Sequence, residues 1–217
     1  YCNEVVDPRS GWRIPLAPTW VIARRAVSVV ARLHPIPDER RFDIEVLEQA
    51  SDADLREAEA NMTWIDGLVS PVDRDGSWIQ RSQRIAIPAD QIRGERLRAW
   101  DADQTHPREG DVFQERLYCI RWVDNQGERH YRAPTAADLA REERVLELLR
   151  ERFAEWQAKG YIPSAKIEPG EKTAEPIRTR GWTHWHHLFN PRQLLTAGLI
   201  AQLSDLPGDV RLLELVA

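Results

Sequence analysis

The feature that most constrains the fold is a long helical pattern directly after Pro134. Thr135 can cap a helix that starts at Ala136, because Asp138 stands in the capping-box position three residues after the cap. Apolar residues then recur at intervals of seven, three, four and three, and they are Leu139, Leu146, Leu149, Phe153 and Trp156. This spacing places one apolar stripe on a helix, and Gly160 suits its C-terminal cap. We therefore expect a helix from Ala136 to about Gly160.

The residues before Pro134 have the pattern of short strands and turns. In 41–47, the apolar Phe42, Ile44 and Val46 alternate with acidic residues, which is typical of a half-buried strand. The other elements expected here are strands at 20–23 and 26–33, a short helix at 51–60 with a capping serine, a strand pair at 76–88, a strong strand at 113–123, and a hairpin turn at 124–127 leading into 128–132.

The residues after the long helix divide into an irregular part and a second helix. Residues 161–180 are rich in Pro, Gly, Lys and Glu without periodicity, which predicts an extended surface connector. A second helix is expected from near Pro191 to about Leu203. The predicted fold class is α+β, with a β-rich, insert-like region over 1–133 and then a helical region over 134–217. That second region should hold two or three helices and an extended linker at 161–190. The absence of a chain-wide βαβ alternation argues against a complete doubly wound sheet.

Composition limits the function classes. The 217 residues carry 30 basic and 35 acidic side chains, a formal charge of −5, whereas a freestanding nucleic-acid-binding domain is more often basic. A local basic face would still suffice for DNA contact. No apolar run approaches the ~18 residues of a membrane span, so no membrane partner is expected. The first residue, Tyr1, is not a methionine, and we expect the chain to be a fragment of a longer protein.

The two cysteines exclude a disulfide framework. Cys2 and Cys119 lie far apart and neither belongs to a C-x-x-C pair, so a four-cysteine zinc site is also impossible from this chain alone. We expect Cys119 to be a small buried residue on a strand and Cys2 to be exposed. Such low cysteine usage suits a reducing compartment, and a cytoplasmic location is expected.

The densest chemistry lies in Gly181–Leu195, which reads GWTHWHHLFNPRQLL and holds three of the six histidines. On a strand His184 and His186 would share a face, and on a helix His184 and His187 would. Either arrangement supplies two imidazoles, whereas a metal site needs a third and usually a fourth ligand, which nothing nearby provides. We expect no metal here, and histidines that pack and form hydrogen bonds instead.

The same segment allows a nucleic-acid interpretation. Its aromatic rings could stack on bases, and neighbouring arginines could contact phosphates. The candidate DNA-binding residues are Trp182, His184, Trp185, His187, Arg178, Arg180 and Arg192, with Phe189 as a further stacking ring. Interleaved aromatics and arginines also suit a buried hinge with cation–π contacts. Both interpretations stay open at the level of sequence.

The most specific local signal in this segment is a helix start. Asn190 is a good N-cap, Pro191 stands at the first helical position, and Gln193 can reach back to the Asn190 amide. Leu188 or Phe189 could then act as a hydrophobic staple. Any functional role of the segment is added to this structural one.

Several motifs of complete enzymes are missing from the sequence. The eleven glycines never occur as G-x-G, so no dinucleotide, S-adenosylmethionine or Walker-type loop is visible. There is no G-x-S-x-G, and no Asp-Pro-Pro-Tyr tetrapeptide of the kind that amino-methyltransferases use to hold an exocyclic amine. We therefore assign no catalytic residue and no cofactor site to this chain.

Four landmarks nevertheless resemble a known family. In chain order they are Gly11-Trp12-Arg13-Ile14-Pro15-Leu16 with Pro18-Thr19-Trp20-Val21-Ile22; Phe113-Gln114-Glu115-Arg116-Leu117-Tyr118-Cys119; Tyr131-Arg132-Ala133-Pro134-Thr135 with Asp138-Leu139; and Leu188-Phe189-Asn190-Pro191-Arg192-Gln193-Leu194-Leu195. They resemble the middle segment of bacterial adenine-specific DNA methylases described as containing a zinc ribbon. The last landmark is the most specific, and the resemblance weakens after about Leu203.

The resemblance implies transfer of a methyl group from S-adenosylmethionine to the N6 amine of adenine in DNA. It implies a Rossmann-type methyltransferase with a flipped target base, whose glycine-rich motif precedes this segment and whose Asp-Pro-Pro-Tyr follows it. It also implies paired zinc cysteines near the start, where this chain has Cys2 alone, so the ribbon would be degenerate and zinc binding is not expected.

Three hypotheses follow. The first is a non-catalytic fragment of an S-adenosylmethionine-dependent DNA adenine methyltransferase, which helps recognise DNA or braces the rest of the methyltransferase chain. The second is a protein-interaction module of a multi-subunit DNA modification or defence complex, which the acidic balance and the charged helix 136–159 favour. The third is a histidine-based metal hydrolase.

Overall fold

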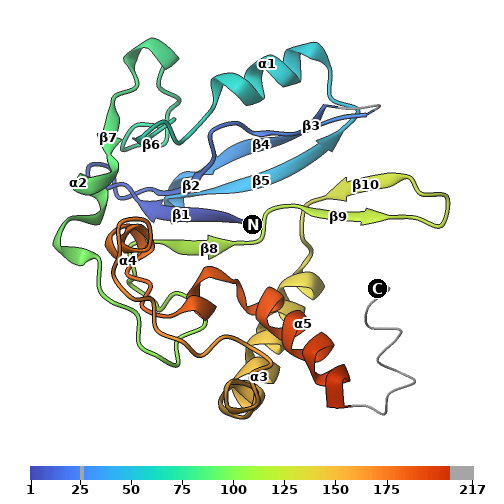
Figure 1. Ribbon diagram of the computed structural model, residues 1–217. Helices are drawn as coiled ribbons and strands as arrows, with labels where there is room; N and C mark the ends of the chain where they lie inside the picture. The colour runs from blue at the N-terminus through green and yellow to red at the C-terminus, as the bar shows by residue number, and fades with distance from the viewer. Residues whose placement is uncertain (25–26, 206–217) are drawn as a thin grey trace. The chain divides into compact units, whose positions relative to one another are not determined.

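The computed structural model describes residues 1–24 and 27–205 and has mixed helices and small antiparallel sheets, which confirms the predicted α+β class (Figure 1). Its contacts divide the chain into two compact units. The first, which we call the β-rich unit, comprises Tyr1–Arg96 and Arg108–Thr135. The second, which we call the helical unit, comprises Leu97–Pro107 and the chain from Ala136 onward. The segment Leu97–Pro107 therefore packs with residues from Ala136 onward and not with its neighbours in sequence.

The β-rich unit contains two three-stranded antiparallel sheets and two strand pairs. The strands of the sheets, in spatial order, are β2 (Arg13–Leu16), β1 (Cys2–Val6) and β8 (Gln114–Arg116), and then β3 (Val21–Arg24), β4 (Ser28–Ile36) and β5 (Arg41–Glu48). The strand pairs are β6 (Gly67–Val69) with β7 (Ala86–Pro88), and β9 (Ile120–Val123) with β10 (Arg129–Arg132). The helices of this unit are α1 (Asp52–Ala60) and α2 (Ala89–Arg93), and its 3-10 turns are Pro37–Glu39, Arg81–Gln83 and Gly94–Arg96.

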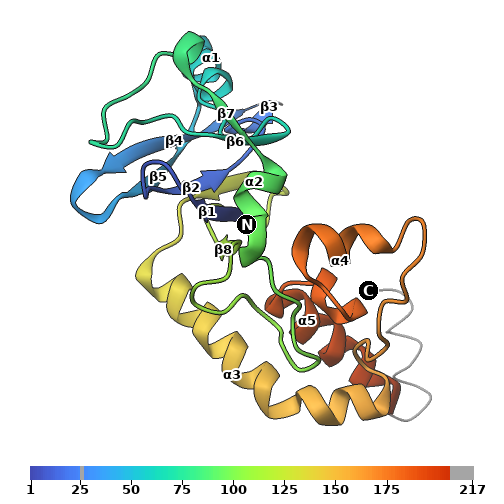
Figure 2. The same cartoon turned by 90° about the vertical axis from the view of Figure 1, so that its left-hand side faces the viewer.

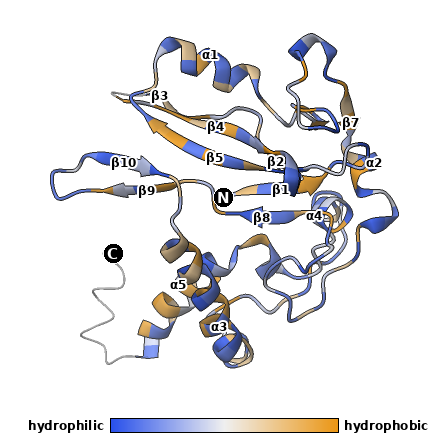
Figure 3. Ribbon diagram, turned by 180° about the vertical axis from the view of Figure 1, so that it is seen from behind, coloured by the Kyte–Doolittle hydropathy of each residue, from blue (hydrophilic) through white to orange (hydrophobic). Residues whose placement is uncertain are grey.

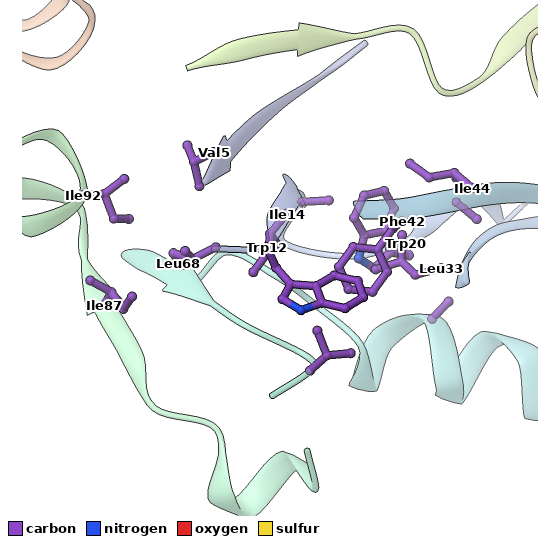
Figure 4. Packing of buried hydrophobic residues seen from close by; sticks show 14 of the residues in the cluster. Val5, Trp12, Ile14, Trp20, Leu33, Phe42, Ile44, Leu68, Ile87 and Ile92 are labelled. Atoms are coloured by element: carbon purple, nitrogen blue, oxygen red, sulfur yellow. The ribbon is translucent and has the colours of Figure 1, made fainter. Parts of the chain in front are cut away.

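The core of the β-rich unit is built around large aromatic side chains (Figure 4). Trp12, Trp20 and Phe42 are almost completely buried, and the rings of Trp12 and Phe42 lie 5.2 Å apart. Phe42 and Ile44 on β5 are buried in this core, whereas Asp43 between them is exposed, as the alternating sequence predicts. Hydrophobic and hydrophilic residues alternate along the β5 ribbon (Figure 3). The β5 pattern therefore fixes which face of its sheet is buried.

The helical unit contains α3 (Ala136–Lys159), α4 (Ala174–Arg180) and α5 (Pro191–Gln202), with 3-10 turns at Trp185–Leu188 and Leu203–Asp205 (Figure 2). α3 packs against α5. The buried residues of this core are Val145, Leu149, Phe153, Trp156, Ile162, Leu194 and Leu195. Burial of these side chains between the helices supplies most of the stability of the helices, as is usual in proteins.

Predictions that rest on local signals are confirmed. The helix at 136–159 ends before Gly160, whose φ of 76° is the left-handed conformation expected of a C-cap glycine. The capping box of α1 is present at Ser51 and Asp54, and the hairpin turn after Val123 closes as predicted.

The predicted stripe on α3 is only partly correct. Leu149, Phe153 and Trp156 are buried as predicted, but Leu139 is 49% exposed and Leu146 is only half-buried. Val145 takes the buried position one turn before Leu149, at the i−4 spacing that places two side chains on the same helix face.

Three predicted segments are wrong in detail. Residues 76–88 are not a strand pair, because Ala86–Pro88 pairs with Gly67–Val69, while the carboxylate of Asp73 accepts bonds from nearby amides and forms a turn at Gly76. Residues 113–123 form two strands, since β8 pairs with β1 and β9 pairs with β10.

The third segment that differs from its prediction is residues 161–190, which the sequence predicts to be an extended connector. It contains α4 and a 3-10 turn, and Pro176 lies in the first turn of α4, where a missing N–H costs nothing.

The cysteine expectations are also corrected. Cys119 lies between β8 and β9 and not on a strand, and it is half-buried. Cys2 lies on β1 and is half-buried rather than exposed, and this burial raises the pKa of its thiol to about 12. Burial also raises the pKa of the Cys119 thiol, so both thiols are poor nucleophiles at neutral pH.

Candidate nucleic-acid interface

The segment Gly181–Asn190 is attached to the distant segment Leu97–Pro107 within the helical unit. The Trp100 amide donates to the Gly181 carbonyl at 2.8 Å, and the Thr183 hydroxyl donates to the Trp100 carbonyl at 2.8 Å. Gly181 has a φ of 74°, and a Cβ there would lie 1.9 Å from the carbonyl oxygen of Arg98. Only glycine permits this close approach of two backbones.

Both ring nitrogens of His187 form hydrogen bonds within the protein. It is 2% exposed, and its Nδ1 accepts a hydrogen bond of 3.0 Å from the Thr183 amide and one of 3.3 Å from the His184 amide. Its Nε2 must therefore carry the proton, which it donates to the Asp101 carbonyl at 3.1 Å. Burial and the neighbouring histidines lower the pKa of His187 to about 3, so the ring is neutral at physiological pH.

Both ring nitrogens of His186 also have partners within the protein. It is completely buried, its Nε2 lies 3.1 Å from the Gln104 carbonyl, and its Nδ1 lies 3.4 Å from the side-chain amide of Gln157. Burial lowers the pKa of His186 to about 4. Its ring also packs edge-on against Phe153, with ring centroids 5.1 Å apart. His186 therefore joins α3 to the segment Leu97–Pro107.

The three imidazoles lie close together without forming a metal site. The ring centroids of His184, His186 and His187 are 4.2 to 5.6 Å apart. The nitrogens of His186 and His187 already have protein partners, and the Nδ1 of His184 lies 2.9 Å from the Thr183 hydroxyl. Across residues 1–24 and 27–205, no group of three or more His, Cys, Asp or Glu side chains is placed to hold a metal ion.

The aromatic residues of the segment differ in exposure. Trp185 is 39% exposed and Phe189 is 43% exposed, whereas Trp182 is half-buried and packs edge-on against Trp100 at 6.3 Å. His184 is also half-buried. Of the rings predicted to stack on bases, Trp185 and Phe189 are thus the ones that this conformation presents, and His187 is not accessible.

The three arginines have different environments. Arg178 is exposed on α4, and the Arg180 guanidinium lies 6.0 Å from the centre of the Trp182 ring. Arg192 pairs with Glu142 of α3, and its Nε lies 2.9 Å from that carboxylate. Whether these residues contact DNA stays a prediction.

The predicted helix start at Asn190 is confirmed. The Asn190 side chain accepts from the Gln193 amide at 2.9 Å, and the Gln193 side chain accepts from the Asn190 amide at 3.0 Å. Pro191 occupies the first helical turn, where its missing N–H costs no hydrogen bond.

Sequence reasoning missed two groups. The first is the segment Leu97–Pro107, whose carbonyls fix the histidines; no local sequence pattern indicates a partner more than eighty residues away. The second is a basic aromatic stretch of the β-rich unit, residues 76–89, which carries Trp78, Arg81 and Arg84 and no acidic residue. The absence of acids over fourteen residues of an acidic protein was a usable signal.

The closest neighbours of several glycines are atoms of the protein itself. The glycines with close neighbours face protein atoms, namely Gly67 against the Ile87 carbonyl, Gly76 against Trp12, Gly181 against the Arg98 carbonyl and Gly198 against Trp156. The small size of these glycines therefore serves internal packing.

Comparisons with protein-family models, curated proteins and solved structures find no match to this chain. Among the helices in residues 1–24 and 27–205, none has the length and apolar character needed to cross a membrane.

Proposed function

We propose that this chain is a non-catalytic, DNA-recognising part of an S-adenosylmethionine-dependent DNA adenine-N6 methyltransferase. The proposal starts from the resemblance of its four landmarks to that family. The observation that supports DNA recognition is the exposure of Trp185 and Phe189 on a segment whose backbone is fixed by hydrogen bonds.

Rigid presentation matters for the affinity of such a surface. An aromatic ring that stacks on a base contributes about 1–3 kcal/mol, but ordering a mobile loop would offset part of it. Here the histidine bonds and the Asn190 cap order the backbone on both sides of Trp185 before any ligand arrives. Arg178 and Arg192 are near in sequence and exposed, so they could contact phosphates.

The proposal is tested by DNA binding of the purified chain and by methylation in the longer protein. Trp185→Ala should weaken DNA binding about tenfold, which corresponds to the lower half of the stacking range. Leu188→Ala is the matched control, because Leu188 is a 40% exposed apolar residue of the same turn without an aromatic ring. Equal DNA binding and methylation by wild type and Trp185→Ala would contradict the recognition role.

Arg192 needs its own control because it pairs with Glu142. Arg192→Gln removes both the ion pair and the positive charge, whereas Glu142→Gln removes the ion pair and the negative charge but leaves the positive charge of Arg192 in place. The pair is surface-exposed and should contribute at most about 1 kcal/mol to stability. Weaker DNA binding by Arg192→Gln but not by Glu142→Gln would assign the effect to a phosphate contact.

A second candidate function is a protein-interaction module of a multi-subunit DNA modification or defence complex. Apolar side chains near the end of α5 favour it, since Leu199, Ile200 and Leu203 are 48%, 52% and 39% exposed. Exposed apolar groups of this kind are typical of protein contacts. Capture of a protein partner that Leu199→Ser abolishes, with no DNA bound at moderate salt, would favour this candidate over the first.

A further inference from the structure

A groove on the β-rich unit lies outside the segment discussed so far. A cavity of about 200 Å³ is lined by Ala60, Met62, Ile65, Val69, Arg81, Arg84 and Ala86. A wider, more open hollow of about 750 Å³ adjoins it, lined by Pro18, Thr19, Val21, Ile22, Ala23, Arg24, Glu59, Met62 and Arg81. Both hollows share Met62 and Arg81, so they adjoin; we call the two together the groove and the smaller one, whose lining is mostly apolar, the slot.

The groove is positively charged although the whole protein is acidic. Among the residues that the structure describes, its charged lining side chains are Arg24, Arg81, Arg84 and Glu59, three positive and one negative, a formal charge of +2. Glu59 is already paired with Arg24. The other positive charges of the described lining belong to Arg81 and Arg84, which both line the apolar slot.

Arg84 is held in place by neutral groups. Its guanidinium donates to the carbonyls of Ile79 and Ala60 at 2.9 and 3.1 Å and to the side-chain oxygen of Asn61 at 3.1 Å. These bonds use three of its five N–H donors and no carboxylate. Burial, and secondly the positive charge of Arg81, lower the pKa of Arg84. Two like charges side by side, one of them partly buried, favour an anion as the third member.

The Arg81 side chain has no hydrogen-bond or ion-pair partner among the described residues, and Arg81 is exposed. An exposed aromatic ring completes the surface, since Trp78 is 44% exposed and lies 6.0 Å from the Arg84 guanidinium. The groove therefore combines two arginines that lack a carboxylate with an apolar slot, and the Trp78 ring lies next to Arg84 outside the residues that line the groove. The slot is smaller than the roughly 300 Å³ lower bound of drug-sized pockets, so it suits a single ring system.

We propose that this groove binds single-stranded DNA, with phosphates at Arg81 and Arg84 and one base in the slot over Met62 and Val69. Charge complementarity favours a polyanion, and the alternation of cationic and apolar or aromatic groups matches a strand whose phosphates alternate with flat bases. Duplex DNA offers its phosphates without a free base, so it should bind less tightly. This inference rests on the proposed function, because it names a DNA-contacting surface of the same module.

The test measures fluorescence anisotropy of a labelled single strand of about 12 nucleotides with the whole chain, at several salt concentrations. Arg81→Gln should lower the affinity about tenfold and reduce the slope of log K against log salt by about 0.7, the value for one phosphate contact on a single strand. Arg150→Gln on α3 is the matched control, because Arg150 is exposed and has no partner among the described residues. It should change neither quantity.

A second variant tests the slot without altering its charge. Ala86→Phe places a ring in the cavity that Ala86 lines, so it should lower affinity about tenfold while leaving the salt slope unchanged. Circular dichroism of each variant would show whether the fold is retained. A short oligoglutamate that competes as well as the oligonucleotide would overturn the assignment to DNA in favour of an acidic peptide.

The outcomes separate this inference from the proposed function. If wild type binds the strand and Trp185→Ala weakens it, but Arg81→Gln and Ala86→Phe do not, the groove is refuted and DNA recognition stands. If wild type binds no DNA at low salt, both are refuted.

Discussion

The packing of α5 on α3 depends on the absence of one methyl group. A Cβ built on Gly198 would lie 2.1 and 2.2 Å from the Cε3 and Cζ3 atoms of the Trp156 indole. Carbon atoms in contact normally lie about 3.5–4.0 Å apart, so Gly198→Ala forces a displacement of more than one ångström. Trp156 is 1% exposed and its indole is rigid, so the displacement must be taken up by the helices themselves.

Two effects of opposite sign determine the stability of Gly198→Ala. Alanine in a helix interior is favoured over glycine by about 1 kcal/mol. Overpacking a well-filled core costs about 1–3 kcal/mol, and an overlap this large belongs at the upper end or beyond. We expect a net loss of about 2 kcal/mol in the free energy of unfolding of the helical unit, so the overlap outweighs the propensity.

The assay is urea denaturation of wild type, Gly198→Ala, Trp156→Leu and the double variant, followed by circular dichroism. With the indole removed, the added methyl group should no longer clash, and Gly198→Ala should become neutral or stabilise by up to about 1 kcal/mol. A change of sign between the two backgrounds is the expected result. Equal or greater stability of Gly198→Ala in the wild-type background would refute the packing argument.

Two further predictions concern the candidate interface. Burial lowers the pKa values of His186 and His187 to about 4 and 3 from an ordinary value of 6.5, so the unfolded chain binds protons that the folded chain does not. Their contribution to stability is full above about pH 6.5 and is lost as the pH falls towards 4 and 3, with a slope of up to about 1.4 kcal/mol per pH unit for each histidine. Denaturant titrations at pH 7 and 5 should show it, and His187→Gln should reduce that slope; an unchanged slope would contradict it. Asn190→Ala should lower the free energy of unfolding by about 1 kcal/mol, measured by thermal denaturation. The control substitution Thr196→Ala, on the exposed side of α5, should change the free energy of unfolding by no more than about 0.5 kcal/mol.

Local signals predicted the parts of the fold whose partners are close in sequence. The Asn190 cap needs only Gln193, three residues away, and the turn after Val123 needs only its own hairpin. α3 is long enough for two signals to predict it together, namely the regular spacing of its apolar residues and the glycine after its last residue. In each of these cases the interacting atoms lie within a few residues, so the sequence contains the whole signal.

Non-local pairing explains the errors. Ala86–Pro88 has strand character, but its partner Gly67–Val69 lies about twenty residues earlier, and nothing in 76–88 identifies it. The break between β8 and β9 arises because the chain leaves the strand pair with β1 and enters a hairpin with β10. Alternating residues give the exposure of a strand's faces but not the identity of its neighbours.

The candidate site shows the same limit for chemistry. The histidines of the Gly181–Leu195 segment suggest a metal or a reactive site only while their partners are unknown. Once the Asp101 and Gln104 carbonyls are in place, the lone pairs and N–H groups of His186 and His187 are occupied, so these side chains stabilise the segment rather than act from it.

A charged side chain without an oppositely charged partner in the protein is a better sign of a binding site than a histidine whose nitrogens are already bonded. Arg84 is satisfied by neutral oxygens and stands beside Arg81, with no carboxylate bonded to either in the part of the chain that the structure describes. A protein with 35 acidic residues has many ways to neutralise a surface arginine, as Glu59 does for Arg24 in the same groove. Two neighbouring cations left without one, both lining an apolar slot, are therefore the feature of this structure that an external anion explains most directly.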